Sequence, residues 1–179
     1  MSHVPPQLHQ LPAFVRGNVF RVVVESPRGS SVKLKFDPGA GAMTLSRPLA
    51  LGVTFPFDWG FVPGTQVSDG DPLDAMLLWD TPTFPGVVIP CRAVALIKVD
   101  QKRKRGRGRE RNDRILAIPV TAPRFEHLRT VRDLPTRLRR ELEQFFFTVT
   151  ALENKDIRIL GWAGPDAAIR AIQGSVVGA

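Results

Sequence analysis

The residues of this chain best suited to chemistry are three aspartates that lie close together. The segment SDGDPLDAM, residues 68–76, places Asp69, Asp71 and Asp74 within six positions, and no lysine or arginine lies nearer to them than eighteen positions. Two like charges about 4 Å apart repel by roughly 4 kcal/mol at the effective dielectric of a protein surface. A bound cation would relieve that repulsion, so the cluster is a candidate metal site.

Two other interpretations of the aspartates compete with a magnesium site. A solvated turn is one, because Gly70 and Pro72 favour turns and so do aspartates. A calcium loop of the EF-hand type is excluded, because its sixth position should be glycine and is Asp74, and its twelfth should be glutamate and is Asp80. Mg²⁺ uses a few carboxylates and leaves positions for water and phosphate oxygens, so it is the better match.

The remaining metal-binding and nucleophilic residue types carry little signal. The single cysteine, Cys91, lies in an apolar run, which predicts a small core residue and no disulfide within the chain. His3, His9 and His127 show no metal-ligand spacing. No apolar run reaches the eighteen residues of a membrane span, and the first residues do not resemble a signal peptide. These features predict a cytoplasmic protein without membrane contact.

The basic character of the chain is concentrated in one segment. The net charge is +8, and the run KRKRGRGRER, residues 102–111, has seven basic residues and one acidic residue. Its cations and glycines would suit a flexible loop against phosphates, and it has no aromatic residue for base stacking. We expect this run to be poorly ordered because its cations repel one another. A solvated loop without a ligand fits the sequence equally well.

The elements that must position these residues follow from hydrophobic periodicity. Helices are expected over 133–153, with Asp133 as cap and Pro135 in the first turn, and over 164–177. Residues 1–16 are expected to form a flexible arm and residues 17–179 a single domain, with the basic run as the loop of a hairpin over 97–118. Strands are expected at 18–26, 32–36, 75–80, 86–99, 114–120 and 156–162. Many strands followed by helices predict an antiparallel β core with flanking helices.

The aspartate segment also resembles a known signature. DGDPLDAM is similar to the D-x-D-P-x-D motif of family I soluble inorganic pyrophosphatases, and the likeness extends from about Val19 to about Ile172. The other segments that resemble the family, in chain order, are VVVESP, DPGAGAMTLSRPL, FPFDWGFVPGT, TPTFPGVVIPCRAVALIKV, RILAIPV, VRDLP and LGWAG. The resemblance implies a mainly β protein of the α+β class, a five-stranded OB-like antiparallel barrel flanked by two helices. It also implies a cytoplasmic homo-oligomer, a hexamer, that hydrolyses pyrophosphate to two phosphates with Mg²⁺.

The resemblance assigns roles to six residues that match the family pattern. Asp69 and Asp74 correspond to metal ligands. Asp71 corresponds to the catalytic aspartate beside the nucleophilic water, where it can also contact the metal. The remaining assignments are two phosphate-binding cations, Lys33 and Arg47, and an active-site carboxylate near the entrance, Glu25.

Other positions depart from the family pattern. Lys35 stands in place of a metal-binding glutamate and Trp59 in place of a phosphate-binding tyrosine, while Val149 and Thr150 replace a tyrosine and a lysine. The Lys35 ammonium is expected within several ångströms of the aspartates, in an ion pair that partly replaces a magnesium ion. The site is then expected to bind fewer divalent ions, and more weakly.

The hairpin departs further from that pattern. At strict register Gln101 and Asn112 replace two aspartates, and Arg114 replaces a lysine as a substrate-binding cation. Asp100 and Asp113 lie one residue away, and a shift of one residue turns a side chain to the other face of a strand unless a β-bulge restores it. Asp113 is therefore a candidate metal ligand, although we do not expect both aspartates to be restored.

Two functions follow from these residues. The first is Mg²⁺-dependent hydrolysis of pyrophosphate, weakened by the substituted positions. A variant of it is hydrolysis of a larger or more anionic phosphoanhydride in a pocket reshaped by Lys35 and Arg114. The second is a catalytically impaired protein of the same fold that binds a polyanion, polyphosphate or nucleic acid, through residues 102–111.

Overall fold

A computed structural model of the chain describes residues 7–103 and 105–178. The strands within these residues are β1 (Phe14–Arg16), β2 (Val19–Ser26), β3 (Val32–Asp37), β4 (Ala42–Pro48), β5 (Asp58–Val62), β6 (Leu73–Leu77), β7 (Val88–Lys102), β8 (Arg109–Arg111), β9 (Arg114–Pro119) and β10 (Arg158–Ala163). The helices are α1 (Thr136–Thr150) and α2 (Pro165–Ser175), with short 3-10 turns η1 (Leu8–Gln10), η2 (Pro123–Phe125) and η3 (Val131–Asp133).

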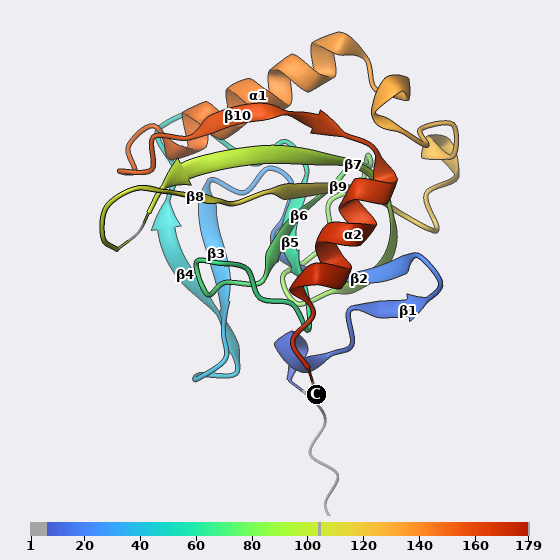
Figure 1. Cartoon of the computed structure of the whole chain (residues 1–179), viewed down its shortest axis with the longest axis horizontal. Coiled ribbons are helices and arrows are strands. Elements are labelled where there is room, and N and C mark those ends of the chain that lie inside the picture. The colour runs from blue at the N-terminus through green and yellow to red at the C-terminus, as the bar shows by residue number, and fades with distance from the viewer. Residues whose placement is uncertain (1–6, 104, 179) are drawn as a thin grey trace, which may run out of the picture.

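Five strands close into a ring, with the two helices packed outside it (Figure 1). β2 pairs with β5 on one side and β7 on the other, and β6 and β9 complete the circuit. This confirms the expected five-stranded β core with flanking helices. One pair differs from the antiparallel expectation: β6 and β9 run parallel, which places Asp74 opposite Arg114.

Successive residues of a strand face opposite sides, and this alternation builds two apolar clusters. On β9, Ile115 and Ala117 join the cluster that includes Ile172 of α2, while Leu116 and Ile118 join the cluster under α1. The four side chains of β9 in these clusters are fully buried. The ring is therefore held from both faces, so the strand ends that carry the polar residues are fixed.

β5 was not predicted as a strand, and it is the element that needs a glycine. A Cβ atom at Gly60 would lie 1.9 Å from the carbonyl oxygen of Val23 on β2, so only glycine permits the two backbones to approach so closely. β5 is only five residues long and contains Asp58 and Gly60, residue types that are depleted in strands, so the sequence does not indicate a strand there.

The helix and terminal predictions need small corrections. Asp133 does not cap α1, which begins at Thr136 after Pro135; its carboxylate instead accepts hydrogen bonds from the backbone N–H groups of Arg129 and Thr130. Residues 1–6 of the predicted arm lie outside the described residues, and 8–16 contain η1 and β1, which pairs with β2. Within the described chain, neither helix is long and apolar enough to cross a membrane.

The expected poor order of the basic run is wrong at the two ends of the run. Residues 102 and 109–111 belong to β7 and β8, which pair as a hairpin. The backbone N–H of Arg103 donates to the carbonyl of Gly108 over 3.1 Å. Ion pairs with acidic neighbours offset part of the repulsion between the cations. The hairpin lies on the same side of the ring as the separate β3–β4 ribbon (Figure 1).

Candidate active site

The loop between β5 and β6 fixes the three aspartates. Gly70 adopts a φ of 86°, in the left-handed region that favours glycine, and so reverses the chain between Asp69 and Asp71. The Asp71 N–H donates to Asp69 Oδ1 over 3.0 Å, and the Asp71 carbonyl accepts from the Val67 N–H over 2.8 Å. Asp74 follows on β6. The segment therefore does form a turn, and this turn holds the carboxylates in place.

The β3–β4 ribbon provides cations opposite the aspartates. Lys33 and Arg47 are paired across the two strands. They share the walls of one cavity of about 370 Å³ with Lys35, Asp69 and Asp71. That volume lies in the range of small-molecule pockets, roughly 300–1,000 Å³. Lys33, Arg47, Asp69 and Asp71 are therefore together in one cavity, and Asp74 is not among its lining residues.

Lys35 forms the ion pair that its position predicts. Its Nζ lies 2.7 Å from Asp71 Oδ2, and both side chains are partly exposed, at 35% and 43%. Burial alone would lower the pKa of the Lys35 ammonium, but the hydrogen bond and charge of Asp71, with Glu25 and Asp74 nearby, raise that pKa above its ordinary value. Lys35 is therefore a permanent cation beside the proposed catalytic aspartate.

Asp74 is paired with a buried cation. Arg114 Nη1 lies 3.5 Å from Asp74 Oδ2, and its side chain is only 6% exposed. The guanidinium sits over the rings of Trp59 and Phe146, with centroid distances of 5.6 and 5.9 Å. Trp59 thus serves as an aromatic support for Arg114, and its own indole N–H has no hydrogen-bond partner among the described residues.

A second, smaller cavity reveals a cation that the sequence did not suggest. Val149 and Thr150 line it together with Lys33, Arg114 and Lys155, in a volume of about 30 Å³. Lys155 also reaches the larger cavity. Burial, and then the charges of Lys33 and Arg114, lower the pKa of its ammonium. Lys155 therefore supplies a positive charge close to Thr150, where the family pattern has lysine.

Arg47 is held by the end of α1 and by the turn that follows it. Its Nε pairs with Glu153 over 2.9 Å, and its Nη2 donates to the carbonyl of Val149, also over 2.9 Å. The guanidinium is thus oriented by α1 and the turn that follows it, while it still lines the cavity. A preoriented guanidinium is well suited to a phosphate, because its N–H donors are arranged as a fork.

The strand ends of the hairpin follow the strict register. Gln101 and Asn112 are buried, Gln101 lines the cavity, and the Asn112 amide donates to Asp69 Oδ2 over 3.5 Å. Asp69 is itself half-buried; burial, together with repulsion from Asp71 and Asp74, raises the pKa of its carboxyl despite the Asp71 N–H. Amides therefore occupy the positions beside Asp69 at which the family pattern has carboxylates.

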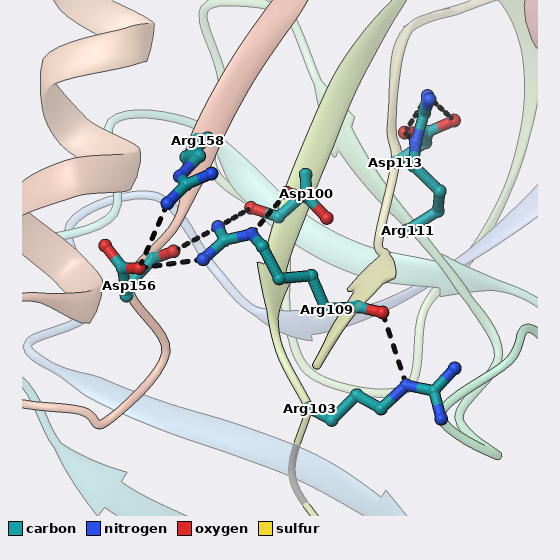
Figure 2. A network of polar contacts seen from close by, with 7 residues as sticks. All are labelled: Asp100, Arg103, Arg109, Arg111, Asp113, Asp156 and Arg158. Carbon is teal, nitrogen blue, oxygen red and sulfur yellow. Dashed lines mark hydrogen bonds and ion pairs between the residues drawn. The ribbon is translucent and has the colours of Figure 1, made fainter. Parts of the chain in front are cut away.

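The two neighbouring aspartates of the hairpin serve as ion-pair partners. Asp100 pairs with Arg109, and Asp113 pairs with Arg111 over 2.7 Å while it accepts from the Val99 N–H over 2.9 Å (Figure 2). Neither lines the cavity that contains Asp69 and Asp71. The geometry does not bring Asp113 to the site as a metal ligand, because no bulge reverses its direction.

Glu25 is buried and does not lie at an entrance. Its side chain is 4% exposed and accepts a hydrogen bond from the Phe36 N–H over 2.9 Å. It borders a neighbouring cavity with Lys35 and Asp71. Burial raises the pKa of its carboxyl to about 7, against the effect of the Phe36 N–H, and Asp74 adds to the rise. Glu25 can therefore carry a proton near neutral pH.

The carboxylates of the site suit a hard cation, but their spacing and their ion pairs with two cations oppose metal binding. Carboxylate oxygens of Asp69 and Asp74 are the ligands that Mg²⁺ prefers. Over residues 7–103 and 105–178, however, no three His, Cys, Asp or Glu side chains are gathered closely enough to hold an ion. Lys35 and Arg114 lie against two of the aspartates. A metal would have to compete with Lys35 for Asp71.

Comparison with known proteins identifies this arrangement. The family profile described as Inorganic pyrophosphatase matches residues 22–177. The chain belongs to the inorganic pyrophosphatase family. It is 35% identical over 166 residues to the inorganic pyrophosphatase of Synechocystis sp., covering 93% of this chain and 95% of that one. It is 39% identical over 148 residues to the inorganic pyrophosphatase of Methanosarcina acetivorans, covering 83% and 84%.

Solved structures agree with the sequence comparison. The inorganic pyrophosphatase of Thermus thermophilus superposes with a TM-score of 0.87 at 31% identity, covering 96% of this chain and 97% of that one. The protein of Coxiella burnetii superposes with a TM-score of 0.84 at 29% identity, covering 93% and 98%. The resemblance based on DGDPLDAM is confirmed, and so is the pyrophosphatase fold.

Proposed function

We propose that this protein hydrolyses inorganic pyrophosphate to two phosphates with the help of a divalent metal ion, Mg²⁺. The observation that carries the proposal is the single cavity in which Asp69 and Asp71 face Lys33 and Arg47. The two carboxylates can bind a metal ion, and the two cations can bind the phosphates. This arrangement suits a phosphate substrate that carries a bound metal ion. Membership of the inorganic pyrophosphatase family supports the same substrate.

The chain's own residues divide the work of the reaction. Lys33, Arg47 and Lys155 bind and orient the phosphates and offset the charge that develops on the leaving one. Asp71 orients a water and takes its proton as the water oxygen bonds to one phosphorus and the bridging P–O bond breaks. Arg114, which is buried, pairs with Asp74 and fixes that carboxylate, and it adds a positive charge to the smaller cavity.

Asp69 and Asp74 would hold the metal, with Asp71 as a third carboxylate when Lys35 gives way. The ion, when bound, would neutralise phosphate charge and make a nearby water more acidic. The Lys35–Asp71 ion pair and the amides at Gln101 and Asn112 support weaker metal binding, and thus slower turnover, than carboxylates at those positions would allow. Assembly into a homo-oligomeric hexamer in the cytoplasm stays a prediction from the resemblance.

The direct test is phosphate release from pyrophosphate by the full chain, in the presence of Mg²⁺ and after chelation with EDTA. We expect release that depends on Mg²⁺ and that falls sharply in Asp69→Asn. Asp166→Asn, an exposed aspartate in the first turn of α2, is the matched control and should behave as wild type. Release that is unaffected by EDTA, or no release at any Mg²⁺ concentration, would contradict the proposal.

A further inference from the structure

The basic hairpin is built onto the site by specific contacts. Arg109 donates to Asp100 on β7 and, over 2.7 Å, to Asp156 in the turn before β10 (Figure 2). Its Nη2 also reaches the Asp156 carbonyl over 2.6 Å. The Lys102 N–H donates to the Lys155 carbonyl over 2.7 Å. Arg109 thus fastens the hairpin beside the turn that carries Lys155, which lines both cavities, as Lys33 and Arg47 also do.

The first cations of the hairpin face the same cavity as the aspartates. Lys102 and Arg103 line it together with Lys33, Lys35 and Arg47. Their polar contacts are with neutral oxygens: Lys102 Nζ with the Asn154 amide oxygen over 3.2 Å, and Arg103 Nε with the Arg109 carbonyl over 3.2 Å. Among the described residues, no carboxylate lies within ion-pair distance of either, and both side chains are exposed.

The charges around the cavity are unequal. Among the residues that the structure describes, its charged lining side chains are six cations and three carboxylates; these are Lys33, Lys35, Arg47, Lys102, Arg103 and Lys155 against Asp69, Asp71 and Glu153. Two of the carboxylates are already engaged, Asp71 by Lys35 and Glu153 by Arg47. Positive charge is therefore in excess at the hairpin end, beyond the cations that would hold two phosphates. An excess of one sign in a concave site concentrates ligands of the opposite sign.

We propose that Lys102 and Arg103 form an additional phosphate subsite, so that the site takes linear phosphate chains of three or more phosphates as well as pyrophosphate. The proposal rests on the proposed function, because the cleaved bond lies at the same aspartates. With tripolyphosphate, one water is consumed: its oxygen bonds to the terminal phosphorus, the adjacent P–O bond breaks, and phosphate and pyrophosphate leave with the two hydrogens of the water shared between them. The pyrophosphate is then a substrate in turn.

The test compares kcat/KM for tripolyphosphate and for pyrophosphate in three proteins. These are wild type, the double variant Lys102→Gln/Arg103→Gln, and the matched control Arg105→Gln/Arg107→Gln, which removes the same charge from exposed positions that do not line the cavity. We expect the tripolyphosphate-to-pyrophosphate ratio to fall by about five- to tenfold in the first variant, as for loss of charge-assisted contacts to one phosphate. The control should change the ratio by less than about twofold, because its charges act only at a distance.

Several outcomes would overturn the subsite. An equal fall in the ratio for both variants would show general attraction by the hairpin, and an unchanged ratio would show no role for Lys102 and Arg103. A single-stranded oligonucleotide that inhibits as strongly as tripolyphosphate at equal phosphate concentration would show a general polyanion surface. If wild type hydrolyses neither substrate, the proposed function fails. Calorimetric titration of the three proteins with tripolyphosphate and with pyrophosphate then tests the subsite separately. If the subsite exists, Lys102→Gln/Arg103→Gln loses affinity for tripolyphosphate but not for pyrophosphate, and the control variant does not.

Discussion

The two ion pairs at the aspartates differ in their surroundings. The Lys35–Asp71 pair is short, at 2.7 Å, but its side chains are 35% and 43% exposed. The Arg114–Asp74 pair is longer, at 3.5 Å, and its side chains are 6% and 21% exposed. Arg114 is further enclosed by the rings of Trp59 and Phe146.

Exposure decides what each pair can do. An exposed pair is screened by water and contributes little to stability, so a metal or a substrate can displace Lys35 at small cost. A buried pair leaves an uncompensated charge when one partner is lost, so Arg114 must remain. Two ion pairs of the same charges thus give one adjustable contact at Asp71, the proposed catalytic aspartate, and one fixed contact at Asp74.

The largest expected effect is on catalysis and concerns the exposed pair. Asp71→Asn removes the group that takes the proton of the attacking water, and general-base catalysis contributes roughly 10²–10⁴-fold in rate. We expect kcat for pyrophosphate to fall by about that factor, with the urea midpoint of unfolding nearly unchanged. A variant that retains most of its activity would show that Asp71 is not the base.

The next effect is on stability and compares the loss of Arg114 with the loss of Lys35. Arg114→Met leaves Asp74 without its partner and should lower the free energy of unfolding by roughly 3 kcal/mol, as for other broken buried pairs. Lys35→Met is the matched variant and should change it by less than about 1 kcal/mol. Urea denaturation in EDTA measures both. Equal losses in the two variants would remove the distinction between the pairs.

Glu25, which borders the neighbouring cavity with Lys35 and Asp71, makes the free energy of unfolding depend on pH. Because its pKa is raised from 4.5 to about 7 on folding, its stabilising contribution is present below pH 4.5 and is lost as the pH rises through about 7. Glu25→Gln removes this dependence. In EDTA, the unfolding free energy of the variant relative to wild type should therefore rise with pH over this range, by up to about 3 kcal/mol. A difference that is flat with pH would contradict the burial of an ionisable Glu25.

The smallest effect concerns Lys155, one of three cations that line both cavities. Lys155→Gln removes one of several positive charges near the phosphates, so we expect KM for pyrophosphate to rise by about three- to tenfold with a smaller change in kcat. Lys98→Gln, a lysine on β7 that does not line either cavity, is the control. A variant with unchanged KM would place Lys155 outside the substrate site.

The sequence predicted the parts of the fold that have a local periodic signal. The alternation in β2 and β3 and the apolar stripe of α1 were sufficient for those elements. β5 was missed because it is short and contains Asp58 and Gly60, which are depleted in strands. The parallel pairing of β6 with β9 depends on how distant segments meet. Local patterns carry no information on that pairing.

The site was predictable where a motif fixes neighbouring residues in the chain. The aspartates follow from the motif, Lys33 and Arg47 follow from the resemblance to the family pattern, and the Lys35–Asp71 ion pair follows from the position of Lys35 in that pattern. Lys155 was missed because it lies in a turn after α1, where no periodicity points it at the cavity. The order of the hairpin was missed because Asp156, which contacts Arg109, is distant in sequence.

We propose that the aspartates form a divalent-metal site for pyrophosphate hydrolysis in which Lys35 competes with the metal for Asp71. The most direct measurement is a Mg²⁺ titration of phosphate release from pyrophosphate by wild type and by Lys35→Glu, with Lys35→Glu/Asn112→Asp as the third protein. We predict that wild type needs more Mg²⁺, that the single variant reaches its maximal rate at lower Mg²⁺ with a higher rate, and that the double variant gains further, because a hard cation gains carboxylate oxygens. Rapid turnover by wild type together with a lower rate for Lys35→Glu at every Mg²⁺ concentration would show that Lys35 binds the substrate and does not compete with the metal.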